Sequence, residues 1–175
     1  MIRKIVIVGP ESTGKSTLCE QLAEHYKTIW VKEYAREYLL KHGTDYTFDN
    51  LLDIAKGQVK LEEDAVSTIS NKPLFIDTDM YVMKVWYEYV FGRCEYFVLD
   101  EIAARNYDLY LLCNIDLPWI EEPMREYPDE KPRKELYNIY KDLLINQTTP
   151  WVEISGNYEE RLQKAIAAVN QVLKA

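Results

Sequence analysis

Ile5-Val6-Ile7-Val8 runs directly into Gly9-Pro10-Glu11-Ser12-Thr13-Gly14-Lys15-Ser16, and this stretch decides the fold. Four consecutive β-branched residues predict a strand that is covered on both faces, as in the middle of a parallel sheet. Gly9 and Gly14 permit the backbone angles that a tight phosphate-binding loop requires. A helix that begins at Lys15 would direct the positive end of its dipole at the same point. The sequence therefore predicts a strand, a phosphate cradle and a helix, in this order.

The loop is a complete Walker A motif and is expected to hold the phosphates of ATP or GTP. Lys15 would reach the β- and γ-phosphates as a point charge, and the Ser16 hydroxyl is placed to ligate Mg²⁺. No guanine-reading Asn-Lys-x-Asp motif is present, which favours ATP as the donor. The predicted nucleotide-binding residues are Gly9, Glu11, Ser12, Thr13, Gly14, Lys15, Ser16 and Thr17, with Asn157 as a candidate contact to the base.

Strand and helix patterns alternate along the rest of the chain. Further strands are expected at 28–31, 74–76, 107–113 and 151–154, and helices at 16–26, 33–40, 48–69, 80–91, 134–145 and 157–173. Between Asp116 and Arg133 the chain is polar and interrupted by four prolines, which is typical of a mobile lid. We predict an α/β, three-layer P-loop kinase fold in one domain, 1–175, with about five parallel strands and a small helical lid around 117–135.

Two aspartates follow the strand expected at 74–76. Asp77 would stand at the carboxyl edge of the sheet, where open α/β sheets bind ligands, and is the candidate for the metal-orienting carboxylate. Asp79 could accept a hydrogen bond from a sugar hydroxyl and is a second candidate for the chemistry. The alternative for either residue is that it caps the helix that starts near Met80.

Glu33, Tyr34 and Arg36 follow the second strand and are expected at the same sheet edge. Glu33 could take the proton of an acceptor hydroxyl, and Arg36 could bind a hydroxyl or a phosphate, with an ion pair to Glu37 as its alternative. In the lid, Arg125 and Arg133 are candidates to neutralise charge on the transferred phosphoryl group, unless they are incidental charges on a solvated loop.

The aromatic residues Trp86, Tyr87 and Tyr89 are expected to pack in the core rather than to form a base-stacking site.

Composition restricts the partners. Lys and Arg total 21 against 29 Asp and Glu, a formal charge of −8, and no basic block marks a nucleic-acid surface. The three cysteines and two histidines lack metal-ligand spacing. The chain shows no signal-peptide core and no apolar run long enough to cross a bilayer, so a cytoplasmic protein with a small-molecule substrate is expected, with no nucleic-acid or membrane partner.

The motifs together resemble the ribosylnicotinamide kinase domain of the NadR family. The resemblance rests on the Walker A loop, Glu33-Tyr34-Ala35-Arg36-Glu37, Phe75-Ile76-Asp77-Thr78-Asp79, Pro118-Trp119 followed by Arg125, and Tyr158-Glu159-Glu160-Arg161. It implies transfer of the γ-phosphate of ATP to the 5′-hydroxyl of nicotinamide riboside, giving nicotinamide mononucleotide. It also implies that Arg36 and Asp77 or Asp79 handle the acceptor.

Two positions depart from that family pattern. A tryptophan before Glu-Tyr and a tyrosine after the glutamine of the long helix are the aromatic pair implied to hold the nicotinamide ring, and this chain has Lys32 and Val59 there. A lysine is an unfavourable neighbour for a positively charged pyridinium. Tyr34, Tyr81 and Trp119 are the candidates to stack on the ring instead. The acceptor could therefore be another nucleoside or small alcohol, and an NTPase switch without an acceptor is the further alternative.

Overall fold

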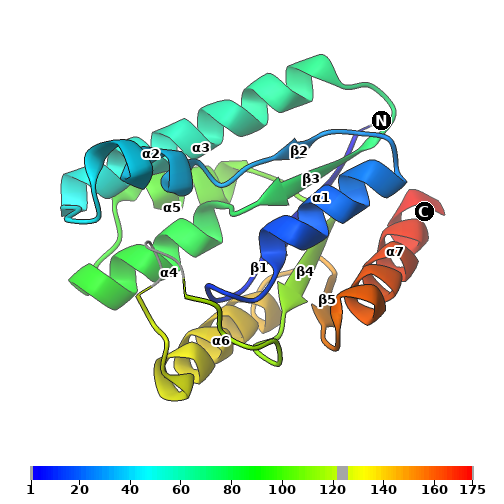
Figure 1. Ribbon diagram of the computed structural model, residues 1–175. Helices are drawn as coiled ribbons and strands as arrows, with labels where there is room; N and C mark the ends of the chain where they lie inside the picture. Colours follow the sequence, from blue (N-terminus) through cyan, green and yellow to red (C-terminus); the bar gives the residue numbers. More distant parts are fainter. Residues whose placement is uncertain (1, 122–125, 175) are drawn as a thin grey trace.

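The computed structural model describes residues 2–121 and 126–174 and shows a parallel sheet between two layers of helices (Figure 1). The five strands lie in the order β2-β3-β1-β4-β5, and every neighbouring pair is parallel. Their bounds are β1 (Arg3–Val8), β2 (Trp30–Val31), β3 (Pro73–Asp77), β4 (Leu109–Cys113) and β5 (Trp151–Ile154). The predicted three-layer α/β fold is confirmed.

Side chains alternate between the two faces of β1. Ile5 and Ile7 lie in one apolar cluster with residues of α1 (Lys15–His25) and α7 (Tyr158–Lys174), which cover that face. Val6 and Val8 lie in a second cluster with residues of α4 (Met80–Phe91) and α6 (Glu130–Ile145). Because both faces are covered, all four apolar side chains are almost fully buried, as the continuous β-branched run predicts.

A third apolar cluster lies away from the central strands, among α2 (Tyr34–His42), α3 (Phe48–Thr68), α4 and α5 (Tyr96–Ala104). Tyr87 and Met83 are fully buried in it. The sequence patterns did not predict α5. Its sequence is strongly apolar, but only Val98 is fully buried, so it lacks the one-sided spacing by which an amphipathic helix is recognised.

The lid region differs from its prediction at one end. The helix expected from Lys134 begins at Glu130, because Pro132 falls in the first turn of α6, where the missing N–H of proline costs no helical hydrogen bond. Residues 117–121 and 126–129 form the loop that leads into it. Of the helices that the structure describes, none is both long and apolar enough to span a bilayer.

The register of the sheet brings the predicted phosphate loop and the acidic strand end together. Ile7 of β1 pairs with Asp77 of β3, and Val8 pairs with Leu112 of β4. Because the loop starts one residue after Val8, it lies beside Asp77 at the carboxyl edge of the sheet. This edge is where a doubly covered parallel sheet places its ligands.

Candidate active site

The phosphate loop has the backbone geometry that its glycines predict. Gly9 has φ 142° and Gly14, the N-cap of α1, has φ 76°, both in the region that side chains disfavour. A Cβ at Gly9 would lie 2.8 Å from the carbonyl oxygen of Cys113. The Thr13 hydroxyl donates to the Pro10 carbonyl at 2.7 Å and closes the loop on itself. Contacts within the protein itself therefore hold the loop in this shape.

Lys15, Ser16 and Asp77 meet at the base of this loop. The Lys15 ammonium donates to the Pro10 carbonyl at 2.9 Å, and the Ser16 hydroxyl donates to Oδ2 of Asp77 at 2.5 Å. The other carboxylate oxygen of Asp77 is buried and has no hydrogen-bond partner within the described part of the chain. A hydroxyl and an unsatisfied carboxylate oxygen are hard oxygen donors, so these residues fit a magnesium ion with its bound waters.

The electrostatics of Asp77 also suit a site for a cation. The pKa of its carboxyl is raised to about 6, mainly by burial and also by the charge of Glu33, against the opposing effects of Lys15, the Ser16 hydroxyl and Arg36. A raised pKa means that the neighbouring groups of the protein do not fully offset the cost of burying the negative charge of the carboxylate. A divalent cation at Asp77 would supply that compensation.

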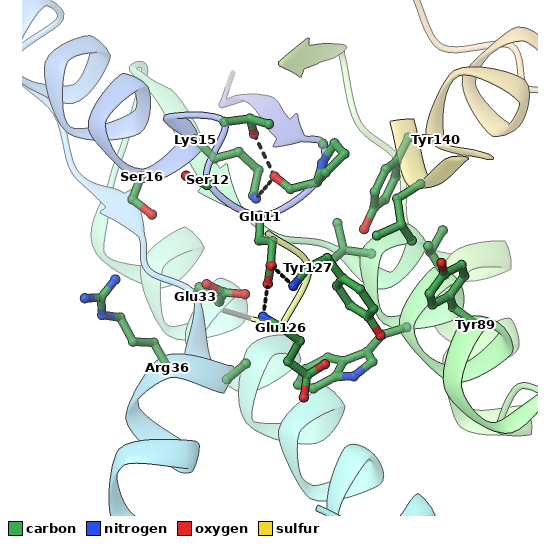
Figure 2. A pocket seen from close by; sticks show the side chains of 18 of the residues that line it. Glu11, Ser12, Lys15, Ser16, Glu33, Arg36, Tyr89, Glu126, Tyr127 and Tyr140 are labelled. Carbon is green, nitrogen blue, oxygen red and sulfur yellow. Dashed lines mark hydrogen bonds between the residues drawn. The ribbon is translucent and has the colours of Figure 1, made fainter. Parts of the chain in front are cut away.

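One cavity, of about 290 Å³, opens from this point (Figure 2). Its phosphate side is formed by the loop, from Gly9 through Thr17, and so includes Glu11, Ser12, Lys15 and Ser16. Glu33 and Arg36 line the same cavity. The structure therefore brings the predicted phosphate-binding residues and two of the predicted acceptor residues to one space.

Glu33 is held at this cavity by a buried glutamine. The amide of Gln58 accepts from the backbone N–H of Tyr34 at 2.8 Å and donates to the carbonyls of Lys32 and Asp77 at 3.3 and 3.4 Å. Glu33 is the N-cap residue of α2, yet within the described residues its carboxylate makes no capping hydrogen bond. Gln58 thus ties the segment around Glu33 to the end of β3 and leaves the carboxylate available to a ligand.

Asp79 and Tyr81 are placed elsewhere. Oδ1 of Asp79 accepts from the backbone N–H groups of Tyr81 and Val82 at 3.0 and 3.3 Å, and Oδ2 accepts from the Tyr110 hydroxyl at 2.8 Å. Burial raises the pKa of Asp79 to about 6 despite these bonds. The physical reason is Thr78, whose φ of 79° turns the chain so that Asp79 caps α4. Neither Asp79 nor Tyr81 lines the cavity; both border a separate small hollow.

Other expected residues also lie outside the cavity lining. The ring of Tyr34 lies against Gly57, where a Cβ would approach it to 2.2 Å. The indole nitrogen of Trp119 is buried, and Arg133, also buried, donates to the Leu117 carbonyl at 3.3 Å. The Asn157 side chain accepts from the backbone N–H of Glu160 at 3.0 Å and so caps α7.

Arg125 lies outside the described residues, so its role as a lid arginine stays a prediction.

The sequence analysis missed an aromatic wall of the cavity. Its members come from the loop before α3, from α4, from the lid loop and from α6: Tyr46, Trp86, Tyr89, Tyr127 and Tyr140. Of the three aromatics expected to pack, Tyr87 is fully buried, while Trp86 and Tyr89 pack partly buried against the apolar clusters and also line the cavity. All three side chains project from about one turn of α4. Their spacing in the sequence therefore could not show which of them line the cavity.

The phosphate loop also holds the lid loop. The carboxylate of Glu11 accepts from the backbone N–H groups of Glu126 and Tyr127 at 3.0 and 2.5 Å (Figure 2). The Ser12 hydroxyl oxygen accepts from the backbone N–H of Ile120 at 2.9 Å. Two variable positions of the Walker A motif therefore fix the loop that closes one side of the cavity.

Behind the phosphate loop, Arg161 of α7 joins three segments of the chain. Its guanidinium donates to the carbonyls of Thr13, Asn114 and Gly156 at 2.8, 2.9 and 2.7 Å and pairs with Asp116. Arg161 is almost fully buried. It therefore positions the phosphate loop against the ends of β4 and β5 without facing the cavity.

Replacing Arg161 by leucine is expected to destabilise the protein by roughly 2–4 kcal/mol, because three carbonyls and a carboxylate lose a buried partner. For a chain of this length the melting temperature should fall by about 10 °C, measured by circular dichroism. Arg3→Leu is the control, since Arg3 pairs with Asp108 at 2.9 Å where both side chains are partly exposed. Equal losses in the two variants would contradict the positioning role.

Comparison with known proteins supports the assignment. A family profile described as AAA domain matches residues 4–161. The trifunctional NAD biosynthesis/regulator protein NadR of Escherichia coli (strain K12) is 29% identical over 98% of this chain. The chain spans less than half of that relative, 43% of its length.

Solved structures show the same architecture. A crystal structure of a NadR protein in complex with NR superposes with a TM-score of 0.84 at 26% identity, over 99% of this chain and 50% of that one. Thymidylate kinase from Ehrlichia chaffeensis superposes with a TM-score of 0.68 at 14% identity, over 96% of this chain and 98% of that one, which shows a shared fold. The predicted resemblance to NadR is confirmed, and the chain, a P-loop protein with a kinase fold, belongs to the AAA domain family.

Proposed function

We propose that this protein transfers the γ-phosphate of ATP to the 5′-hydroxyl of a nucleoside, and that nicotinamide riboside is the acceptor. One observation carries the proposal: Glu33 and Arg36 line the same cavity as Lys15 and Ser16. A pure nucleotide switch needs no second polar group facing the γ-phosphate, whereas a kinase needs a carboxylate near the acceptor hydroxyl. Similarity to a NadR protein in complex with NR supports the choice of acceptor.

On the donor side, the residues supply positive charge and position. Lys15 would exchange its contact with the Pro10 carbonyl, at 2.9 Å, for the β- and γ-phosphate oxygens. Ser16 and Asp77 would hold a magnesium ion, which when bound neutralises charge on the phosphates. The backbone N–H groups of the loop and the start of α1 add their partial charges. These interactions are strongest when charge develops on the transferred group, so they lower the barrier.

On the acceptor side, Glu33 would orient the 5′-hydroxyl and accept its proton. The hydroxyl oxygen forms a bond to the γ-phosphorus as the bond between this phosphorus and the bridging oxygen of ADP breaks, and the proton passes to the Glu33 carboxylate. Arg36 would stabilise negative charge on the phosphoryl oxygens or bind a ribose hydroxyl. The role of Arg125 on the phosphoryl group remains part of this proposal, whereas Arg133 would have to leave its contact with the Leu117 carbonyl to reach that group.

A nucleoside panel tests the proposal. Purified protein with Mg-ATP is incubated with nicotinamide riboside, adenosine, cytidine, uridine and thymidine, and products are read by mass spectrometry. We expect nicotinamide riboside to gain the mass of one phosphate and to raise ADP release by on the order of 10²-fold over the rate without acceptor, because water is a poorly positioned nucleophile. Steady ADP release that no nucleoside stimulates would favour a switch and overturn the proposal.

A further inference from the structure

The aromatic wall of the cavity ends in a carboxylate. The Trp86 indole donates to the Tyr46 hydroxyl at 2.9 Å, and this hydroxyl donates to the two carboxylate oxygens of Glu126 at 3.1 and 3.2 Å. The rings of Tyr46 and Trp86 meet edge to face, with centroids 4.9 Å apart. Tyr46, Trp86 and Glu126 all line the cavity, and we call these three residues the wall triad. The triad combines flat π surfaces with a negative charge.

Among the described residues, no basic side chain of the cavity lining balances the charge of Glu126. Burial raises its pKa and Glu11 raises it further, while the Tyr46 hydroxyl opposes the shift. Glu11 accepts two backbone N–H groups of the lid loop, so it lies close to Glu126 without neutralising it. Figure 2 shows the Arg36 guanidinium directed away from Glu126, with Lys15 at the phosphate loop. A cation between the rings and Glu126 would relieve this repulsion.

Lys32 and Val59 occupy the two positions that carry ring-holding aromatic residues in the related family, and neither can hold a ring in this cavity. Lys32 is exposed, and its ammonium lies 5.8 Å from the centroid of the Trp30 ring. Val59 is buried in the cluster between α2, α3 and α4. Neither residue lines the cavity. If the acceptor carries a ring, other side chains of this protein must hold it.

We infer that the wall triad binds a planar aromatic cation, and that the acceptor base is selected for its positive charge. The inference rests on the proposed function and adds to it the property of the base that is recognised and the residues that recognise it. Indole and phenol rings attract a cation through their π faces. Glu126 adds a Coulombic attraction that a neutral base would not feel. The hydrogen-bonded chain from Trp86 to Glu126 fixes the three groups in one geometry, which reduces the entropy lost on binding.

Charge selection can be measured with a pair of acceptors that differ mainly in charge. Nicotinamide riboside is a cation, and its dihydro form is neutral with nearly the same shape. We expect the ratio of kcat/KM for the cation over the neutral form to fall about fivefold in Glu126→Gln, since the carboxylate is partly exposed. Trp86→Leu should lower the ratio about tenfold, because it removes the larger π surface. Glu121→Gln is the matched control, being an exposed lid carboxylate outside the cavity lining.

A binding measurement separates this inference from the kinase proposal. The probe is 1-methylnicotinamide, a cation without a ribose, and it is compared with neutral nicotinamide by titration calorimetry. We expect the cation to bind more tightly to the wild-type protein and to Glu121→Gln, and this preference to be lost in Glu126→Gln. Tyr46→Phe keeps the ring and removes only the hydroxyl, and it should weaken the preference for the cation. Because this change is small, it tests the wall triad even if Trp86→Leu fails to fold.

The outcomes distinguish the two proposals. If the panel shows no transfer to nicotinamide riboside but the cation preference depends on Glu126, the wall triad stands and the acceptor assignment fails. If nicotinamide riboside is phosphorylated while Glu126→Gln and Trp86→Leu keep the wild-type ratio and the wild-type preference, the kinase proposal stands and the triad is overturned.

Discussion

Lys15→Ala is expected to reduce kcat for phosphoryl transfer by on the order of 10³-fold, because it removes the point charge that the phosphate loop directs at the β- and γ-phosphates. The Lys15 ammonium contacts the Pro10 carbonyl at 2.9 Å, one hydrogen bond that contributes about 1 kcal/mol to folding. The variant should therefore fold normally. Initial rates of ADP release with saturating acceptor measure the loss, and titration with ATP measures weaker binding.

The control is Lys60→Ala, which removes an exposed lysine from the middle of α3. It should keep the wild-type rate, since alanine is favourable in a helix and Lys60 does not line the cavity. If Lys15→Ala retained full activity with an unchanged melting temperature, the phosphate loop would not be the donor site.

Asp77→Asn is expected to lower kcat by about 10²-fold and to raise the Mg²⁺ concentration for half-maximal activity by about tenfold. Asparagine keeps the size and one acceptor for the Ser16 hydroxyl, 2.5 Å away, but removes the charge. The same change should not destabilise the protein without ligands. The pKa of Asp77 is about 6 in the folded state against 3.8 as its ordinary value, so at pH 7.5 ionisation costs the folded state stability that asparagine would restore.

Activity as a function of Mg²⁺ concentration tests the first part, and the melting temperature without nucleotide tests the second. Asp79→Asn is the comparison, because Asp79 has a similarly raised pKa yet caps α4. Its Mg²⁺ dependence should match the wild type, since asparagine is also a good N-cap. An Asp77→Asn protein with wild-type Mg²⁺ dependence would remove Asp77 from the metal site.

Most of the sheet and the donor side could be predicted from sequence because their determinants are local. A β-branched run, two glycines and a lysine are contiguous, and each constrains the backbone or the charge at its own position. The position of Asp77 at the carboxyl edge of the sheet could be predicted in the same way, because Asp77 is the first polar residue after a buried apolar run. The bounds of β2 and the start of α6 moved by a few residues, since terminal residues depend on neighbours that the chain supplies from elsewhere.

The acceptor side could be predicted only in part. Glu33 and Arg36 lie in the cavity because they directly follow a strand of the sheet, whereas Asp79 does not, because Thr78 adopts a left-handed conformation that the sequence around it gives no sign of. Trp86 and Tyr87 are adjacent aromatics on one helix, and only the tertiary structure shows that Tyr87 is fully buried while Trp86 also lines the cavity.

The sequence by itself determined that the chain forms a parallel sheet with a phosphate loop at its carboxyl edge, because glycine angles, strand burial and helix start are encoded within the twelve consecutive residues from Ile5 to Ser16. Only the tertiary structure decided which aromatic side chains line the cavity. Tyr46 forms hydrogen bonds with Trp86, 40 residues further along the chain, and with Glu126, 80 residues further along. Their meeting depends on how α4 and the lid loop pack over the sheet, and no local pattern contains that information.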